Sequence, residues 1–235
     1  MELVDWLPFH GYILQLEQEG LVTRTFRRLD PARQQAIFTA IVDEAVEKGP
    51  SALNIKEVAR RAGVSVGSLY TYFPNREGMV TFVVELCVRF MLDMFEASRP
   101  YLAEMTLREA LAAYLSTGVE WSRAYMGLVR LFARAAYYGD PELAESLVRP
   151  IATRLREVIH EMLALAVERG EIRAGVDLEA TARIVHALTI AVGDSQLLPY
   201  LNTYFQVMDD DISPERVLDA LMALVLRGIG TKETG

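Results

Sequence analysis

Hydrophobic positions recur along nearly the whole chain at the three- and four-residue spacing of amphipathic helices, and no segment alternates convincingly as a strand would. The segment from Pro31 to Lys48 is typical, with apolar residues at positions 36, 37, 40, 41 and 45. Glycine and proline separate such segments by short loops. The pattern therefore predicts an all-α protein of nine or ten helices.

Capping residues mark where several of these helices begin. An N-cap residue followed by a proline, which is well tolerated at the first helical position, occurs at Asp30-Pro31, Asp140-Pro141 and Ser213-Pro214. Thr106 with Glu109 has the spacing of a capping box. Further helices are predicted over residues 76–97, 150–170 and 177–197, and the longest loop over residues 198–212.

Composition places the chain among soluble globular proteins, because 51% of its 235 residues are hydrophobic and 24% are charged. Its single cysteine, Cys87, excludes an internal disulfide. The N-terminus lacks the basic-then-apolar layout of a secretion signal, and no uncharged apolar run is long enough to span a bilayer. We therefore expect a cytoplasmic protein without a membrane partner.

Charge is distributed unevenly along a chain whose net charge is −8. Residues 1–23 carry four acidic and no basic side chains, residues 24–80 carry nine basic and six acidic ones, and the remainder is acidic. DNA phosphates respond to local charge rather than to the average, so the one basic segment is a candidate for DNA binding. Arg60 and Arg61 either add to this charge or form a solvated helix face.

A short part of the basic segment has the layout of two helices joined by a tight turn. Asn54 can cap the first helix, and Glu57 three residues later completes a box-like arrangement. Gly63 ends that helix, because the residue just past a helix end often needs a positive φ. Ser65 caps a second helix that runs to Tyr72. This is the layout of a helix-turn-helix, whose second helix enters the major groove of DNA.

The second helix of this motif carries the side chains that can read base edges. Its exposed positions are expected to be Val66, Gly67, Ser68, Thr71 and Tyr72. Hydroxyl groups can hydrogen-bond to bases, a valine can contact a thymine methyl group, and a glycine permits close approach. Contacts to phosphates, which position the motif, are expected from Lys56, Tyr70 and Arg76.

The stretch from about Pro31 to Val80 resembles the DNA-binding domain of the TetR (tetracycline repressor) family. The matching residues are Gly49, Ile55, Val58-Ala59, Ala62-Gly63-Val64-Ser65, Gly67-Ser68-Leu69-Tyr70-Thr71-Tyr72-Phe73 and Asn75-Arg76-Glu77. The resemblance implies a three-helix DNA-binding head, a connecting helix, and a helical effector domain that dimerises through its last two long helices. It also implies the base and phosphate contacts named above.

Three features depart from the pattern of that family. Val66 stands where a polar or basic residue is common, Arg76 stands where lysine is usual, and the first 29 residues have no counterpart. We therefore divide the chain into an N-terminal, helical extension (1–29), a helix-turn-helix DNA-binding domain (30–76) and an effector-binding and dimerisation domain (77–235).

The extension has a predicted amphipathic helix over about residues 12–20, and apolar side chains that include Trp6 and Phe9. These side chains can pack on the effector domain or on a partner subunit. The acidic residues of the extension oppose a role as a DNA-binding arm. The arginines that follow, Arg24, Arg27 and Arg28, can however contact the DNA backbone.

The last two long helices carry apolar residues on more than one side. Burial within a monomer core would explain this pattern, and so would a contribution to a four-helix bundle in a homodimer. The resemblance favours the homodimer, with interface candidates His186, Ile190, Leu218, Leu221 and Val225. Two heads related by a twofold axis would read half-sites about one helical turn, ~34 Å, apart.

Aromatic and methionine side chains on the connecting helix and the central helices are candidates for an effector pocket. They are Met91, Phe95, Trp121, Tyr125, Phe132 and Tyr137. Together they could line an apolar cavity, and for each of them the alternative is ordinary core packing. The hypothesis that follows is an effector that is apolar or aromatic.

The sequence thus predicts a sequence-specific DNA-binding transcriptional regulator, a repressor that a small ligand releases from a palindromic double-stranded operator. The alternative is an architectural or activating DNA-binding protein without a small-molecule effector. His160-Glu161 begins an HExxH pattern, but its fifth position is Ala164. We therefore expect no metal site, no cofactor and no enzymatic activity.

Overall fold

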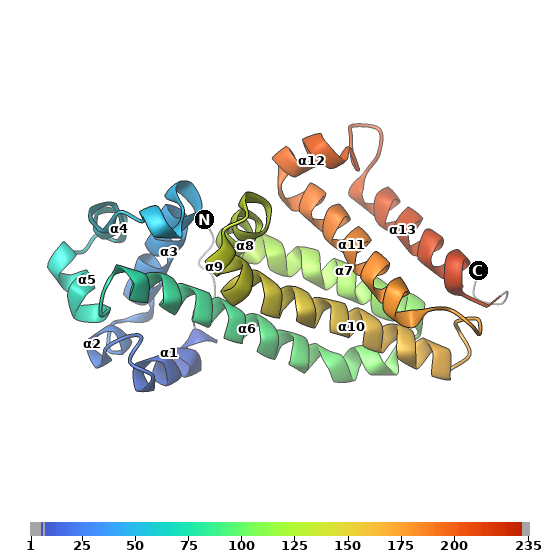
Figure 1. Ribbon diagram of the computed structural model, residues 1–235, viewed down its shortest axis with the longest axis horizontal. Helices are drawn as coiled ribbons and strands as arrows, with labels where there is room; N and C mark the ends of the chain where they lie inside the picture. The colour runs from blue at the N-terminus through green and yellow to red at the C-terminus, as the bar shows by residue number, and fades with distance from the viewer. Residues whose placement is uncertain (1–5, 7, 232–235) are drawn as a thin grey trace. The chain divides into compact units, whose positions relative to one another are not determined.

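The computed structural model describes residues 6 and 8–231. This part of the chain is helical, and its only β-structure is two isolated bridges, so the all-α prediction is confirmed. The helices are α1 (Phe9–Gln18), α2 (Arg24–Arg27), α3 (Pro31–Lys48), α4 (Ile55–Ala62), α5 (Val66–Tyr72), α6 (Arg76–Glu104), α7 (Leu107–Ala124), α8 (Met126–Tyr138), α9 (Pro141–Leu143), α10 (Arg149–Glu168), α11 (Leu178–Leu197), α12 (Pro199–Phe205) and α13 (Pro214–Ile229) (Figure 1).

Most of the capping residues predicted from the sequence begin their helices as expected. The carboxylate of Asp30 accepts the N–H of Arg33 at 2.9 Å, and the carboxylate of Asp177 accepts the N–H of Ala180 at 3.1 Å. In the capping box before α7, a Glu109 carboxylate oxygen accepts the N–H of Thr106 at 3.0 Å. Each contact satisfies an N–H group that has no partner inside its own helix.

The prediction of a loop over residues 198–212 is wrong, because α12 occupies residues 199–205. Pro199 stands at the start of α12, where its missing N–H costs nothing. The amide of Asn202 then holds the next turn, accepting the N–H of Met208 at 3.1 Å and donating to its carbonyl at 2.8 Å. A seven-residue helix is too short for hydrophobic periodicity to reveal it.

The chain divides into two compact units. The first is formed by residues up to Asp93 together with Ala124–Ile151, and the second by Met94–Arg123 together with residues from Ala152 onward. The first unit thus combines the extension and the helix-turn-helix with α8 and α9. The division of roles at residue 76 stays a prediction.

An aromatic cluster forms the core of the first unit. Phe26, Phe73 and Phe82 are fully buried, with ring centroids 5.1–5.3 Å apart. Trp6 and Phe9 from the extension are buried as well. Their rings lie 4.8 Å apart, which is a normal separation for a packed aromatic pair. The extension is therefore part of the core of this unit rather than an appendage to it.

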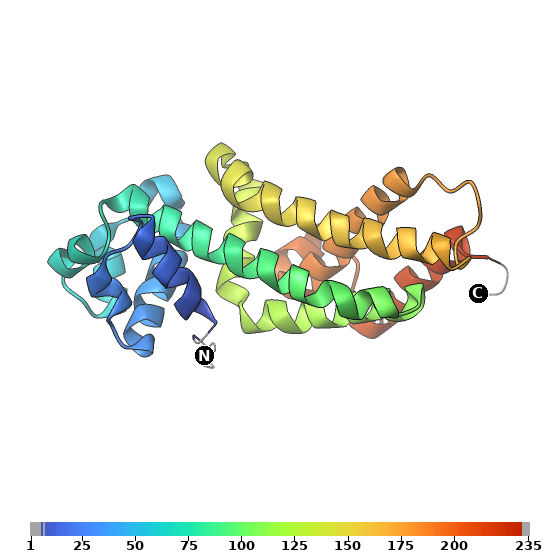
Figure 2. The ribbon, with the colours of Figure 1, turned by 90° about the horizontal axis from the view of Figure 1, so that it is seen from below.

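Helix α1 lies against the first half of α6 (Figure 2). The Phe9 ring packs 4.6 Å from that of Phe90, and the Tyr12 hydroxyl donates to Asp93 at 2.8 Å. Burial and the nearby Asp93 carboxylate raise the pKa of Tyr12 to about 12. These contacts place the docking site of the extension on α6, within the first unit.

The second unit is a layered set of helices. The second half of α6 lies beside α10, and α11 lies beside α12 and α13 (Figures 1 and 2). Ion pairs join α6 to α10, since Arg154 contacts Glu96 and Arg99 contacts Glu161 at 2.9 Å. No helix in residues 8–231 is long and apolar enough to cross a membrane.

Candidate functional site

Helices α4 and α5 form the predicted helix-turn-helix. Gly63 ends α4 with φ 65°, a left-handed conformation that favours glycine because it has no Cβ. The Ser65 hydroxyl then accepts the N–H of Ser68 at 3.0 Å and caps α5. Leu69 is fully buried and fixes α5 to the rest of the unit. The turn and the start of the second helix are thus set by local residues, as the sequence indicated.

The start of α4 differs from the prediction of a box formed by Asn54 and Glu57. The Asn54 side chain accepts the N–H of Lys56 at 3.1 Å, but the Glu57 carboxylate is bound to Arg60 and Arg61, which lower its pKa to about 2. The N–H of Asn54 donates instead to Glu44 on α3, at 3.3 Å. A buried carboxylate from another helix has taken the role expected of Glu57.

Arg61 is a structural residue rather than a free cation. Its guanidinium lies 3.3 Å from Glu44, 2.7 Å from Glu47 and 3.1 Å from Glu57. The side chain of Glu44 is only 1% exposed, so Arg61 compensates a carboxylate that water cannot reach. Three carboxylate partners leave Arg61 unsuited to a phosphate.

The face of α5 that is turned to solvent contains the predicted base-contact residues in different degrees. Gly67 and Thr71 are exposed, whereas Val66, Ser68 and Tyr72 are half-buried. The Thr71 hydroxyl donates to the Gly67 carbonyl at 3.1 Å, and its remaining lone pair can still accept a hydrogen bond. The Tyr72 ring packs 6.0 Å from that of Phe26.

The three predicted phosphate contacts also lie at the surface. Lys56 is exposed and makes no ion pair among the described residues, and Tyr70 is 54% exposed. Arg76, at the start of α6, lies 3.3 Å from the carboxylate of its neighbour Glu77. Arg76 must therefore exchange a carboxylate for a phosphate if it binds DNA.

The close turn between α5 and α6 requires a glycine at position 78. The side chain of Asn75 accepts the N–H of Gly78 at 2.7 Å and so caps α6. A Cβ at position 78 would lie 2.8 Å from the Cγ of Pro74, closer than carbon atoms pack. Only glycine fits without displacing the proline ring that ends the helix-turn-helix.

Thr23, which the sequence analysis did not single out, binds the far end of α5. Its N–H donates to the carbonyl of Tyr72 at 2.9 Å, and its hydroxyl donates to the carbonyl of Thr71 at 2.8 Å. The last carbonyls of a helix have no partner inside it, so Thr23 satisfies two of them. The contact joins residues 48 apart in the chain, and no local pattern could indicate it.

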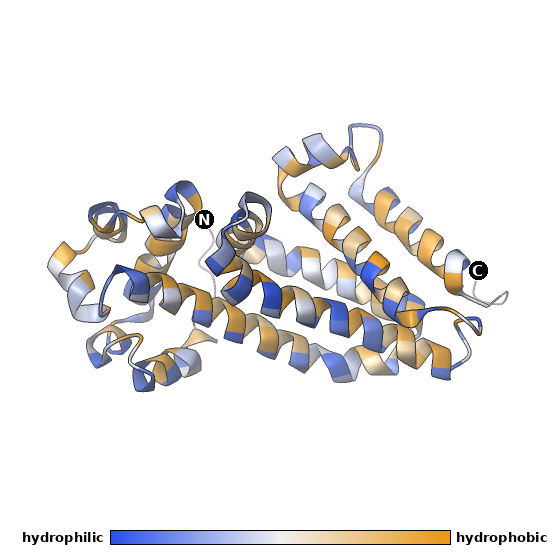
Figure 3. Cartoon of the chain, viewed as in Figure 1, coloured by the Kyte–Doolittle hydropathy of each residue, from blue (hydrophilic) through white to orange (hydrophobic). Residues whose placement is uncertain are grey.

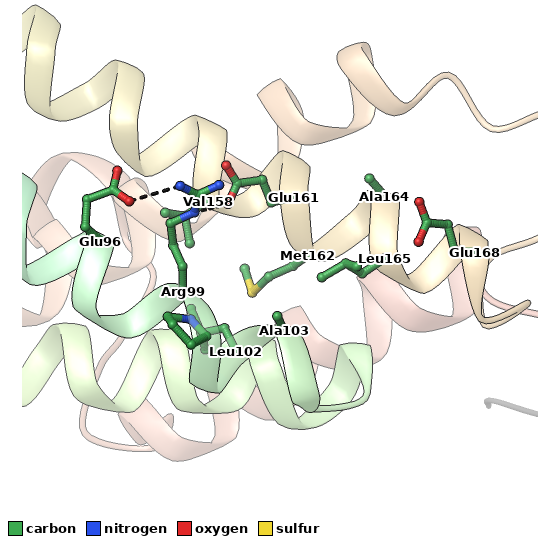
Figure 4. A pocket seen from close by; sticks show the side chains of 11 residues that line it. Glu96, Arg99, Leu102, Ala103, Val158, Glu161, Met162, Ala164, Leu165 and Glu168 are labelled. Carbon is green, nitrogen blue, oxygen red and sulfur yellow. Dashed lines mark hydrogen bonds and ion pairs between the residues drawn. The ribbon is translucent and has the colours of Figure 1, made fainter.

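The second unit contains an open groove of about 530 Å³ between α6 and α10 (Figure 4). Apolar side chains line it from both helices: Pro100, Leu102, Ala103, Val158, Met162, Ala164 and Leu165. The charged side chains at the groove are Glu96, Arg99, Glu161 and Glu168. Its volume is within the range of small-molecule sites, ~300–1,000 Å³.

None of the six predicted effector-pocket residues lines this groove. Met91, Tyr125, Phe132 and Tyr137 belong to the first unit, and Phe95 and Trp121 to the second. Tyr125 packs 5.3 Å from the Phe90 ring, and Phe95 is buried. These two take part in core packing, and an effector role for the six stays a prediction.

Two stretches of the chain match family models. Residues 37–81 match the model described as bacterial regulatory proteins, tetR family, and residues 104–191 match that of the tetracyclin repressor-like C-terminal domain. The chain belongs to the TetR family. The match at 37–81 contains the whole helix-turn-helix, so the family assignment and the geometry of α4 and α5 agree.

Curated and solved proteins agree with this assignment. The transcriptional regulator RutR of Escherichia coli K12 is 28% identical over 159 residues, 67% of this chain and 71% of its own. FadR of Bacillus subtilis, solved with stearoyl-CoA, has a TM-score of 0.57 at 21% identity, covering 83% of this chain and 98% of its own. SmeT of Stenotrophomonas maltophilia, solved with triclosan, has a TM-score of 0.64 at 15% identity, covering 87% and 94%.

In this TetR-family chain, the apolar side chains exposed on α11 and α13 differ from the predicted interface residues. Leu221 and Val225 are buried in their own unit, and His186, Ile190 and Leu218 are half-buried. Ile184 on α11 is 62% exposed, and Leu224 on α13 is 63% exposed. Hydrophobic residues run along much of α13 (Figure 3). Ile184 and Leu224 are therefore the large apolar side chains that these two helices expose, and an interface role for the five predicted residues stays a prediction.

Proposed function

We propose that this protein is a transcriptional repressor that binds a palindromic double-stranded operator as a homodimer and leaves it when a small ligand binds. The observation that carries the proposal is α5, a capped helix that presents Gly67 and Thr71 to solvent within a matched tetR-family segment. Its relative RutR is a transcriptional regulator, and SmeT is the repressor of an efflux pump. Bacterial DNA lies in the cytoplasm, where the protein would act.

Replacing Lys56 by alanine is expected to weaken binding to operator and non-operator DNA alike, because phosphate contacts carry no sequence information. Removing one phosphate contact should also lower the slope of log K against log salt concentration by about 0.9.

Replacing Thr71 by alanine should instead reduce the preference for the operator by about tenfold, since it takes away a base contact. Fluorescence anisotropy with DNA from upstream of the gene, at several salt concentrations, measures both quantities.

Lys48 provides the matched control for Lys56. It is exposed on the last turn of α3, before Gly49, where an added Cβ would lie 3.1 Å from the guanidinium of Arg134 on α8. Replacing Lys48 by alanine should leave affinity and salt slope unchanged. A change of selectivity in the Lys56 variant would contradict the roles assigned, and the absence of any selected site for the native protein would contradict the proposed function.

The groove between α6 and α10 is our candidate for the effector site. Its apolar lining favours an apolar or aromatic ligand, because burying such a surface is worth about 25 cal/mol for each Å² removed from water. FadR was solved with stearoyl-CoA and SmeT with triclosan, so proteins of this fold accommodate small molecules. The six residues predicted from the sequence, Met91, Phe95, Trp121, Tyr125, Phe132 and Tyr137, remain a second candidate set.

Calorimetry with a panel of hydrophobic compounds and polar metabolites tests the effector class. A hydrophobic compound is expected to bind and to lower operator affinity, and the variant Ala103→Phe, which fills the groove, should weaken its binding at least tenfold. Ala97→Phe, at an exposed position of α6 outside the groove, is the control. Binding of polar metabolites alone would overturn the apolar effector, and binding of DNA without any ligand response would favour the architectural alternative.

A further inference from the structure

Helix α2 is fastened to the end of the recognition helix α5. Thr23, which caps α2 by accepting the N–H of Phe26, also donates from its N–H to Tyr72 and from its hydroxyl to Thr71. One residue therefore begins α2 and completes the C-terminal end of α5. Any displacement of α2 would leave two carbonyls of α5 without their partners.

The other end of α2 is fixed by α3. The fully buried side chain of Gln34 donates to the carbonyls of Phe26 and Arg27, at 3.2 and 3.0 Å, and accepts the indole N–H of Trp6 at 2.9 Å. The Phe26 ring lies in the aromatic core, 5.3 Å from that of Phe73. Helix α2 is thus a rigid part of the head, with a fixed position relative to α5.

The arginines of α2, together with Arg28 directly after it, divide between two faces. Arg27 points to α1 and pairs with Glu17. Arg24 is the first residue of α2, and Arg28 is its C-cap, whose backbone still has right-handed helical angles, so the two lie four positions apart on one face; both are exposed. Within residues 8–231 neither makes an ion pair or a side-chain hydrogen bond, so two cations are available on this face.

The acidic residue inside α1 and the one that follows this helix do not cancel this charge. Glu17 is paired with Arg27, and Glu19 with Arg89 at 2.6 Å. Both carboxylates are therefore already compensated by arginines, which agrees with the sequence-based expectation that the arginines after the acidic segment can contact the DNA backbone.

We propose that Arg24 and Arg28 form a second DNA-backbone site, which binds phosphates beside the groove that α5 enters; the site rests on the proposed function. The major groove is about 12 Å wide, and an α-helix with its side chains has a diameter of about 10–12 Å, so α5 alone fills the groove. A segment packed beside α5 has no room to reach the base edges, and its side chains meet the sugar-phosphate backbone at the edge of the groove instead. The bidentate guanidinium groups of arginine fit phosphate oxygens at such an edge.

The test uses the full chain and the DNA site that the native protein selects from random-sequence duplexes. For each phosphate contact that it removes, the double variant Arg24→Ala/Arg28→Ala should bind this duplex about fivefold more weakly at about 0.15 M salt, with a salt slope lower by about 0.9. Non-operator DNA should show the same reduction in affinity. Arg24→Lys/Arg28→Lys keeps both charges and should restore most of the slope.

Arg108→Ala is the matched control, because Arg108 is an exposed arginine of α7 with no ion pair among the described residues. It should bind as the native protein does. If the double alanine variant keeps the native affinity and salt slope, the second site is overturned while the proposed function stands. If the native protein selects no DNA, both fall together. An unchanged melting temperature in the double variant excludes unfolding as the cause of weaker binding.

Discussion

Replacing Arg61 by alanine is expected to lower the free energy of unfolding by about 3–5 kcal/mol, because it leaves a buried carboxylate without its countercharge. The carboxylate is that of Glu44, whose side chain is 1% exposed and whose other oxygen accepts the N–H of Asn54. Loss of Arg61 therefore disturbs the start of α4 as well as its packing on α3. Urea denaturation of the full chain measures the change.

The adjacent arginine supplies the control. Arg60 is 71% exposed and pairs only with Glu57 among the described residues, so Arg60→Ala should leave the urea midpoint close to that of the native protein. The double variant Glu44→Gln/Arg61→Ala removes the unpaired buried carboxylate and should recover part of the lost free energy of unfolding. If Arg61→Ala were as mild as Arg60→Ala, the buried ion pair would have no structural role.

Replacing Leu224 by aspartate is expected to separate the proposed homodimer and, with it, to reduce operator affinity by at least a hundredfold. In a twofold interface the same patch meets itself, so a single substitution introduces a charge on both sides. Burying an unpaired carboxylate costs several kcal/mol, and about 3 kcal/mol already corresponds to a factor above one hundred. Ile184→Asp on α11 should act in the same way.

Sedimentation equilibrium gives the mass, which should fall from twice 26.4 kDa to 26.4 kDa in either variant. Leu14→Asp is the control, since Leu14 is a leucine of α1 with 45% of its side chain exposed. It should stay dimeric and bind the operator normally. A native protein of 26.4 kDa at micromolar concentration, or a dimeric Leu224 variant, would count against the α11–α13 interface.

Features that depend on neighbouring residues were predictable from the sequence. The caps at Asp30 and Asp177, the left-handed glycine at Gly63 and the turn before α5 all follow from chemistry within four residues. Features that join distant parts of the chain were not. Glu44 displaced Glu57 from its expected role because α3 brings a carboxylate to the start of α4, ten residues away in sequence.

The exposed side of α13 shows the same limit. Leu221, Leu224 and Val225 are all large and apolar, and the sequence pattern does not distinguish which of them faces a partner and which faces the core. In the structure the first and third are 7% exposed and Leu224 is 63% exposed. Apolar residues on more than one side of a helix indicate that it is covered on several sides, but only its neighbours decide which side chain faces inward.

The packing of α1 and α2 affects how this protein can be engineered. A chimeric regulator made by transferring the helix-turn-helix from residue 30 onward would omit Phe26, and the rings of Phe73 and Phe82 that it covers would face water. Such a graft would also leave the end of α5 uncapped. A transferable head must include Trp6, because its indole N–H binds the buried Gln34 side chain that holds α2 in place.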